Sequence, residues 1–132
     1  MPAISNITVK KYDGTTDVTY VPVASASSDG VPAEYQLQTG FPVPATRPSL
    51  SISTRSNTKK TSRRLVAAYK WPLFSLDTSG RPVLNGSVNG EFSIVLPQDV
   101  DPLVVREAHQ QFAKLIASLP MRDSMDTGMA PR

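Results

Sequence analysis

Two stretches of alternating polar and apolar side chains, separated by the polar segment SNTKK, constrain the fold of this chain most. Alternation with a period of two places successive side chains on opposite faces of a β-strand. In residues 47–55 the polar series is Arg47, Ser49, Ser51, Ser53 and Arg55. In residues 64–71 the apolar series is Leu65, Ala67, Tyr69 and Trp71, and the opposite series is Arg64, Val66, Ala68 and Lys70. Pairing as a hairpin would align two apolar faces over a core and two polar faces into one basic, hydroxyl-rich surface.

Further segments predict a complete antiparallel sheet. ITVKKYDGTTDVTYVPV, within residues 1–24, is typical of a β-hairpin with its turn at Asp-Gly. The main sheet is predicted over residues 33–97 as five strands. These include the short strand EYQLQT, the proline-rich GFPVPATRP as a connector or ragged edge strand, and the last strand VNGEFSIVL. Residues 73–87 contain two glycines and a proline and are predicted to form a long loop.

The period of the hydrophobic pattern changes from two to about 3.6 at Asp101. Asp101 suits the N-cap of a helix, and Pro102 suits its first turn. Apolar residues then recur at three- and four-residue spacing: Val104, Val105, Ala108, Phe112, Leu115, Ile116 and Leu119. We expect an amphipathic helix over 101–119, ended by Pro120, and a short helix or tail over 120–132. Residues 1–132 thus read as one α+β domain, a size that buries most of its apolar surface.

The distribution of charge favours a polyanionic partner. The net charge of +3 is small, but no acidic residue lies between Glu34 and Asp77. That interval holds half of the fourteen basic residues: Arg47, Arg55, Lys59, Lys60, Arg63, Arg64 and Lys70. A clustered positive field attracts nucleic acid more than a diffuse one does. The alternative is a solvated basic loop without a partner.

Several other classes of function lack support in the sequence. There is no cysteine for a disulfide or a thiolate metal site, and the single histidine, His109, has no metal-ligating neighbours. The sequence contains no nucleophile elbow and no P-loop. No apolar run approaches the roughly 20 residues that span a bilayer, and the N-terminal pattern does not match a secretory signal. We expect no enzyme activity, cofactor, metal ion or membrane partner.

The polar sheet face has the chemistry for binding RNA. Lysine and arginine side chains would contact phosphates, and the strand-borne serines could donate hydrogen bonds to phosphate or ribose. Asn89 and Glu91 could distinguish bases by their donor and acceptor patterns. One helix is about 10 Å wide and cannot cover five strands spaced ~4.8 Å apart. Either a helix from a second subunit or the N-terminal hairpin must cover the remaining apolar face.

In this order of elements the chain resembles the coat proteins of single-stranded RNA bacteriophages (the levivirus type). YDGTTDVTYVPVASASSDGVPAEY is similar to the family's N-terminal hairpin, loop and start of the main sheet. RPSLSISTRSNTKKTSRRLVAAYKWP resembles its two central strands, and SVNGEFSIVLP its last strand with an Asn-x-Glu pair. DPLVVREAHQQFAKLIASL occupies the place of its C-terminal helix.

The resemblance implies an obligate, interlocking homodimer that assembles into an icosahedral shell around viral RNA, in virions formed in the cytoplasm of a bacterial host. It also implies that an RNA hairpin, the operator, binds the inner sheet face and represses translation of the replicase. Residues 73–87 resemble the loop that changes conformation around the symmetry axes of the shell. The alternative is a small RNA-binding regulatory protein that forms no capsid.

By position, the RNA-binding residues implied are Arg47, Ser49, Ser51, Ser53, Arg55, Lys59, Lys60, Arg64, Val66, Ala68, Lys70, Ser87, Asn89 and Glu91. The chain departs from the best-studied members at three of them. Val66 and Ala68 replace a threonine and a lysine, and Ser87 replaces a stacking tyrosine. A different or weaker operator preference is expected.

Overall fold

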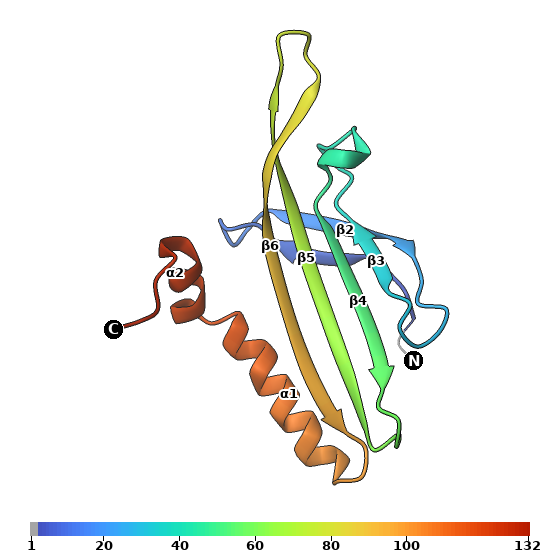
Figure 1. Cartoon of the computed structure of the whole chain (residues 1–132). Coiled ribbons are helices and arrows are strands. Elements are labelled where there is room, and N and C mark those ends of the chain that lie inside the picture. Colours follow the sequence, from blue (N-terminus) through green and yellow to red (C-terminus); the bar gives the residue numbers. More distant parts are fainter. Residues whose placement is uncertain (1–2) are drawn as a thin grey trace.

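The computed structural model describes residues 3–132, which form six antiparallel strands and two C-terminal α-helices (Figure 1). The strands lie in the sheet in chain order, so neighbours in sequence are neighbours in space. The elements are β1 (Ile7–Lys10), β2 (Asp17–Ala24), β3 (Ala33–Gln36), the 3₁₀ helix η1 (Pro44–Thr46), β4 (Ser49–Ser56), β5 (Ser62–Leu76), β6 (Pro82–Pro97), α1 (Pro102–Ile116) and α2 (Leu119–Thr127). This confirms the predicted fold class; the first two residues of the segment 1–24 lie outside the described residues.

The hairpin β1–β2 closes at the predicted Asp-Gly turn. Asp13 Oδ1 accepts hydrogen bonds from the backbone N of Thr15 and Thr16, each at 2.9 Å, and Asp13 Oδ2 accepts one from Thr16 Oγ1 at 2.6 Å. These three bonds stabilise the ionised carboxylate and lower the pKa of Asp13 to about 2. Gly14 has φ +75°, a conformation that glycine adopts without steric cost.

The predicted pairing of the two alternating segments is correct. Leu50 lies opposite Tyr69, and Ser51 lies opposite Ala68, so apolar meets apolar and the polar series share the other face. The turn that joins β4 to β5 is held by Asn57, whose Oδ1 accepts bonds from the backbone N of Thr61 at 2.8 Å and of Ser62 at 3.3 Å. The local sequence therefore determines the register of this hairpin.

The prediction of a long loop over residues 73–87 is wrong. β5 continues to Leu76 and β6 begins at Pro82, which leaves only residues 77–81 as the turn. Asp77 Oδ1 organises this turn by accepting bonds from Ser79 N at 3.0 Å and Arg81 N at 2.8 Å. Pro82 stands at the first position of a strand, where proline is tolerated. Gly86 lies opposite Leu73, where the register shifts. Pro82 and Gly86, which often interrupt strands, are therefore both compatible with a long hairpin.

The strand count also differs from the prediction: residues 33–97, predicted as a five-stranded main sheet, contain the four strands β3 to β6. The proline-rich segment 40–48 adds no strand; it is a connector that contains η1. Arg47 fixes this connector, since its Nε donates to Phe41 O at 2.9 Å and its Nη2 to Pro42 O at 3.3 Å. Of the two alternatives left open by the sequence, connector and edge strand, the connector is correct.

The N-terminal hairpin folds across the apolar face of the sheet and makes the main core (Figure 1). Tyr20 of β2 packs with Tyr35 and Leu37, and its hydroxyl lies 2.8 Å from that of Tyr69 on β5. Burial and this bond, which favours the neutral phenol, raise the pKa of Tyr69. The hairpin therefore covers part of the apolar face within the same chain, as one of the two predicted alternatives required.

The C-terminal helix is shorter than predicted and is followed by a second helix. Asp101 is the N-cap, and its Oδ1 accepts a bond from Leu103 N at 3.0 Å. α1 ends at Ile116 rather than near residue 119, because the chain turns at 117–118 before α2. Pro120 does not end α1; it lies in the first turn of α2, where its missing N–H costs nothing. None of the described helices is long and apolar enough to cross a membrane.

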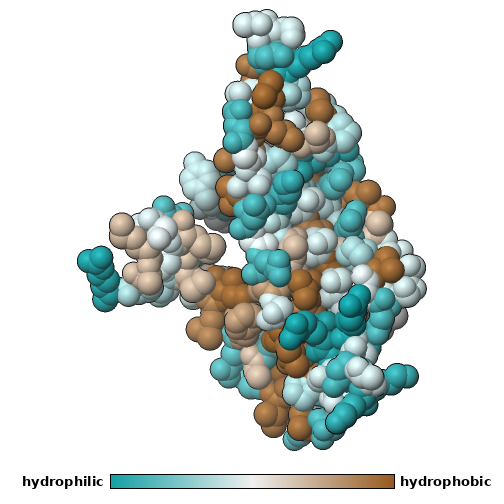
Figure 2. Space-filling view, viewed as in Figure 1, coloured by the Kyte–Doolittle hydropathy of each residue, from teal (hydrophilic) through white to brown (hydrophobic). Residues whose placement is uncertain are grey.

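The apolar side chains of α1 form an arc around the helix. Part of this arc faces the sheet of the same chain, and part is exposed to solvent. Phe112 contacts Phe92 of β6 edge to face, with the ring centroids 6.1 Å apart, and Val105 and Ile116 on the same side are half-buried. Beside them Val104 and Leu115 are 64% and 62% exposed. Figure 2 shows hydrophobic residues gathered along α1 and on the protruding end of the β5–β6 hairpin. Exposed apolar surface of this extent is typical of a subunit that packs against another chain.

Candidate nucleic-acid interface

The sheet face opposite the helices carries most of the predicted RNA-binding residues in ordered cross-strand rows. Directly paired residues of an antiparallel sheet point to the same face. The register therefore defines three rows that cross β4, β5 and β6: Ser49–Lys70–Asn89, Ser51–Ala68–Glu91 and Ser53–Val66–Ser93. A fourth row is Arg55–Arg64–Val95, and Ser87 lies opposite Pro72 beyond the first row.

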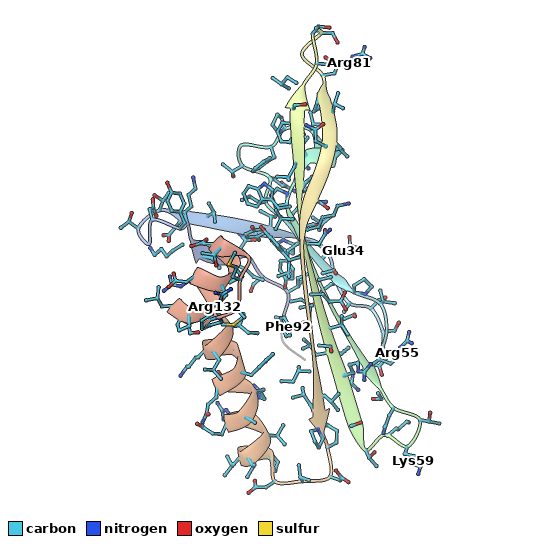
Figure 3. The ribbon with its side chains drawn as sticks, turned by 60° about the vertical axis from the view of Figure 1, so that its left-hand side comes forward. Glu34, Arg55, Lys59, Arg81, Phe92 and Arg132 are labelled. Atoms are coloured by element: carbon cyan, nitrogen blue, oxygen red, sulfur yellow. The ribbon has the colours of Figure 1, made fainter. Side chains whose placement is uncertain are left out.

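The end of this face near the β4–β5 turn is strongly basic. Arg55 and Arg64 are directly opposite each other, and both are exposed. Lys59 and Lys60 lie in the adjacent turn, with Lys60 at φ +57°. Arg55 and Arg64 line a hollow of about 420 Å³ together with serine and asparagine side chains. Figure 3 shows Arg55 and Lys59 on the side of the sheet away from α1.

Like charges directly opposite each other destabilise an antiparallel pair. Among the described residues the two ion pairs join Lys10 to Asp17 and Arg63 to Asp29, so neither neutralises the Arg55–Arg64 pair. Two arginines on a hollow whose lining contains no acidic residue are suited to an anionic group such as a phosphate. This arrangement can hold a polyanion through its backbone.

The centre of the face is different, because it combines acids with amides and hydroxyls. Glu91 lies in one cross-strand row with Ser51, and Ser51 pairs on its other side with Glu34 of β3. A second hollow, of about 400 Å³, is lined in part by Lys70, Asn89 and Glu91. Ser87 Oγ donates to Asn89 Oδ1 at 3.1 Å. These groups are suited to hydrogen bonds with base edges rather than with phosphates.

The structure adds residues that the sequence reasoning did not include and separates one that it did. Glu34 and Gln36 of β3 extend two rows of the polar face, since they pair with Ser51 and Ser49. Their alternation in EYQLQT was the signal that could have identified them. Arg47 stands before β4, and its guanidinium is bound to the connector, so it is not grouped with Arg55 and Arg64.

Within residues 3–132, no three His, Cys, Asp or Glu side chains are grouped so that they could hold a metal ion. His109 is half-buried on α1, on the opposite side of the sheet from the polar face. The polar face itself is built from charged and hydrogen-bonding side chains of β3 to β6.

The fold and this face define an α+β protein with one sheet face open and polar, and the other covered by a hairpin and helices. The chain is similar over 99% of its length to a subunit of the virus-like particle of Beihai levi-like virus 21, with a TM-score of 0.82 and 15% identity over 99% of that chain. It is also similar to the bacteriophage EMS014 coat protein, with a TM-score of 0.78 and 15% identity over 99% of this chain and 100% of that one. The bacteriophage GA capsid protein matches with a TM-score of 0.74 and 16% identity over 95% of each chain.

No protein-family model and no curated protein sequence matches the chain. The structural likeness confirms the predicted resemblance to the coat proteins of RNA bacteriophages at the level of the fold. Identities this low carry no residue roles across, so the RNA-binding residues remain predictions.

Proposed function

We propose that this chain is a viral coat protein that forms dimers and assembles into an icosahedral shell around single-stranded RNA. The observation that carries the proposal is the agreement of the whole chain, hairpin, sheet and helices together, with subunits of virus-like particles. As such it is a structural protein of the virion rather than an enzyme, and it assembles in the cytoplasm of a bacterial host.

Dimer formation is supported by two unsatisfied surfaces on the same side of the molecule. Among the described residues, the 16-residue strand β6 pairs with β5 alone, so its outer edge presents free backbone donors and acceptors. Long unpaired edges are sites of strand pairing between chains. The exposed apolar arc of α1, which includes Val104 and Leu115, lies beside this edge. Pairing of two β6 strands would carry each α1 over the sheet of its partner and bury that arc.

The role in RNA binding rests on the unneutralised Arg55–Arg64 pair and its hollow. The basic end binds phosphates, and the two rows that end in Asn89 and Glu91 read bases through these side chains. We extend the proposal to repression of replicase translation through an operator hairpin bound on this face. Because Val66, Ala68 and Ser87 have smaller or less polar side chains than the family residues they replace, the operator differs from those of the best-studied members.

The protruding end of the β5–β6 hairpin supplies contacts between dimers. Leu76 and Leu84 are 67% and 54% exposed on it, although both belong to paired strands. A strand pair that protrudes beyond the other strands with exposed leucines gains little in an isolated subunit. It is suited to a contact that forms only in the shell.

Expression in bacteria followed by size-exclusion chromatography and electron microscopy tests the proposal. We expect megadalton particles with the ultraviolet absorbance of nucleic acid. Leu115→Asp should abolish particles and leave a folded subunit, because this side chain is exposed in the single chain. Gln110→Asp, on the polar side of the same helix, is the matched control and should leave assembly intact. A folded 14.3 kDa monomer that binds RNA without assembling would instead support the alternative, a small regulatory protein.

A further inference from the structure

Arg63, in the middle of the basic segment, is half-buried and held in place by polar contacts. It lies opposite Ser56, on the face away from Arg64. Its Nη1 donates to Ser56 Oγ at 2.8 Å, and its Nη2 donates to Thr54 Oγ1 at 3.2 Å and to Asp29 Oδ1 at 2.7 Å. The hydrogen bond from Arg63, together with a backbone hydrogen bond from Ser56 N and the positive charge of Arg63, lowers the pKa of Asp29. Arg63 is thus occupied by contacts within the chain, unlike its neighbour in sequence.

Asp29 belongs to a short turn, residues 28–31, that is hydrogen-bonded to the edge of β4. β3 pairs with β4 only as far as Ile52, so the end of β4 has no strand beside it on that edge. Gly30 N donates to Thr54 O at 2.9 Å, which places the turn against this free edge. We call residues 28–31 the clip.

The clip contacts both faces of the sheet at once. On one face Asp29 binds Arg63; on the other, Gly30 lies against the guanidinium of Arg55. A Cβ at Gly30 would lie 2.9 Å from Arg55 Nη2, closer than real Cβ contacts allow, and Gly30 has φ +84°. The absence of a side chain at this position therefore leaves room for the guanidinium of Arg55 next to the clip.

A free arginine side chain loses conformational entropy when it binds a phosphate, and prior restraint reduces that loss. We propose that Asp29, Gly30 and Arg63 are positioning residues for RNA binding: the Asp29–Arg63 ion pair holds Gly30 next to Arg55 and keeps the Arg55 guanidinium at the hollow that Arg64 also lines, where a phosphate binds. The inference rests on the proposed function, since it concerns the same basic hollow. Asp29 is an acid whose role is to strengthen the binding of an anion.

The sign of one substitution tests this inference. Removal of an acid normally strengthens RNA binding, because it makes the protein more positive. Asp29→Asn should instead weaken the binding of a short fluorescein-labelled single-stranded RNA of mixed sequence by about three- to tenfold, measured by fluorescence anisotropy on dissociated subunits. Asp99→Asn removes an exposed acid that lies outside the clip, after the end of β6, and is the matched control; it should leave binding unchanged or slightly tighter.

Two further variants keep the result interpretable. Gly30→Ala displaces Arg55 without changing the net charge, so it should weaken binding to a similar extent even if Asp29→Asn fails to fold. In the Arg55→Gln background, Asp29→Asn should have no further effect, since the clip acts through Arg55. Hydrogen exchange at Gly30 N should accelerate in the Asp29→Asn protein while the rest of the sheet stays protected.

The outcomes separate the two proposals. If the unaltered protein and the Asp99→Asn variant bind RNA, but Asp29→Asn and Gly30→Ala bind equally well, the positioning role is overturned and the coat-protein proposal stands. Equal losses for Asp29→Asn with and without Arg55 would show that the clip does not act through that side chain, and would overturn the inference too. If the unaltered protein binds no RNA, the proposed RNA-binding function fails, and the inference fails with it.

Discussion

Replacement of Arg64 by glutamine should stabilise the free protein and at the same time weaken its binding to RNA. Arg64 lies directly opposite Arg55, and among the described residues neither takes part in an ion pair. Directly opposed like charges cost roughly 0.2–1 kcal/mol. Relief of about 0.5 kcal/mol should raise the Tm of the RNA-free protein by about 2 °C at low ionic strength. The gain should disappear at high salt, because both guanidinium groups are exposed to solvent.

The effect on RNA should have the opposite sign. Loss of one arginine–phosphate contact should weaken binding about tenfold at low salt. It should also reduce the slope of log K against log salt concentration by about 0.7, the value for one contact to a single strand. Arg64→Gln keeps the Cβ and Cγ methylenes and a polar end group on the side chain, so packing against β6 changes little.

Differential scanning fluorimetry and fluorescence anisotropy over a salt series measure the two effects on the same preparations. Arg106→Gln, an exposed arginine on α1, is the matched control for net charge and should leave both the Tm and the salt slope nearly unchanged. A lower Tm for Arg64→Gln would show that charge repulsion between Arg55 and Arg64 does not destabilise the free protein. An equal fall in slope for both variants would mean that RNA responds to net charge alone, and the argument for a phosphate site would be refuted.

Three further predictions concern the scaffold. The pKa of Asp13 is lowered from 3.8 to about 2, so its ionised form stabilises the β1–β2 turn above about pH 4. That stabilisation should be lost as the pH falls from about 4 to about 2. NMR titration of the carboxyl group and of the turn amides would measure this loss. Tyr69→Phe leaves the part-buried hydroxyl of Tyr20 without its partner and should lower the free energy of unfolding, measured in urea, by about 1 kcal/mol. The double variant Tyr20→Phe/Tyr69→Phe should recover part of that loss, because no unpaired hydroxyl remains. Asp101→Ala removes the N-cap of α1 and should cost about 1 kcal/mol, with increased hydrogen exchange at Leu103 N.

The sequence was informative where a pattern is local and its physical cause is strong. The alternation in 47–55 and 64–71 predicted both the pairing of β4 with β5 and the composition of the polar face, because a shift by one residue would expose the apolar series. Asp101 predicted the start of α1, since a cap is a property of a few adjacent residues.

Sequence reasoning was wrong where residues that usually break strands are accommodated by the partner strand. Pro82 and Gly86 suggested a loop, yet they stand at a strand start and at a register shift in a hairpin whose turn is held by Asp77. Such positions can be recognised only when the opposite strand is known. The early end of α1 similarly reflects the turn into α2, and Pro120 alone could not reveal it.

The sequence by itself determined the pairing of β4 with β5, the helical C-terminus and the concentration of bases around the β4–β5 turn, because side-chain periodicity and charge are local properties of the chain. Only the tertiary structure decided that the hairpin covers the sheet through Tyr20 and Tyr69. It likewise decided that two adjacent arginines differ, Arg64 facing the hollow and Arg63 bound to Asp29. The physical reason is that these distinctions depend on contacts between residues 34 to 49 positions apart, which no local pattern encodes.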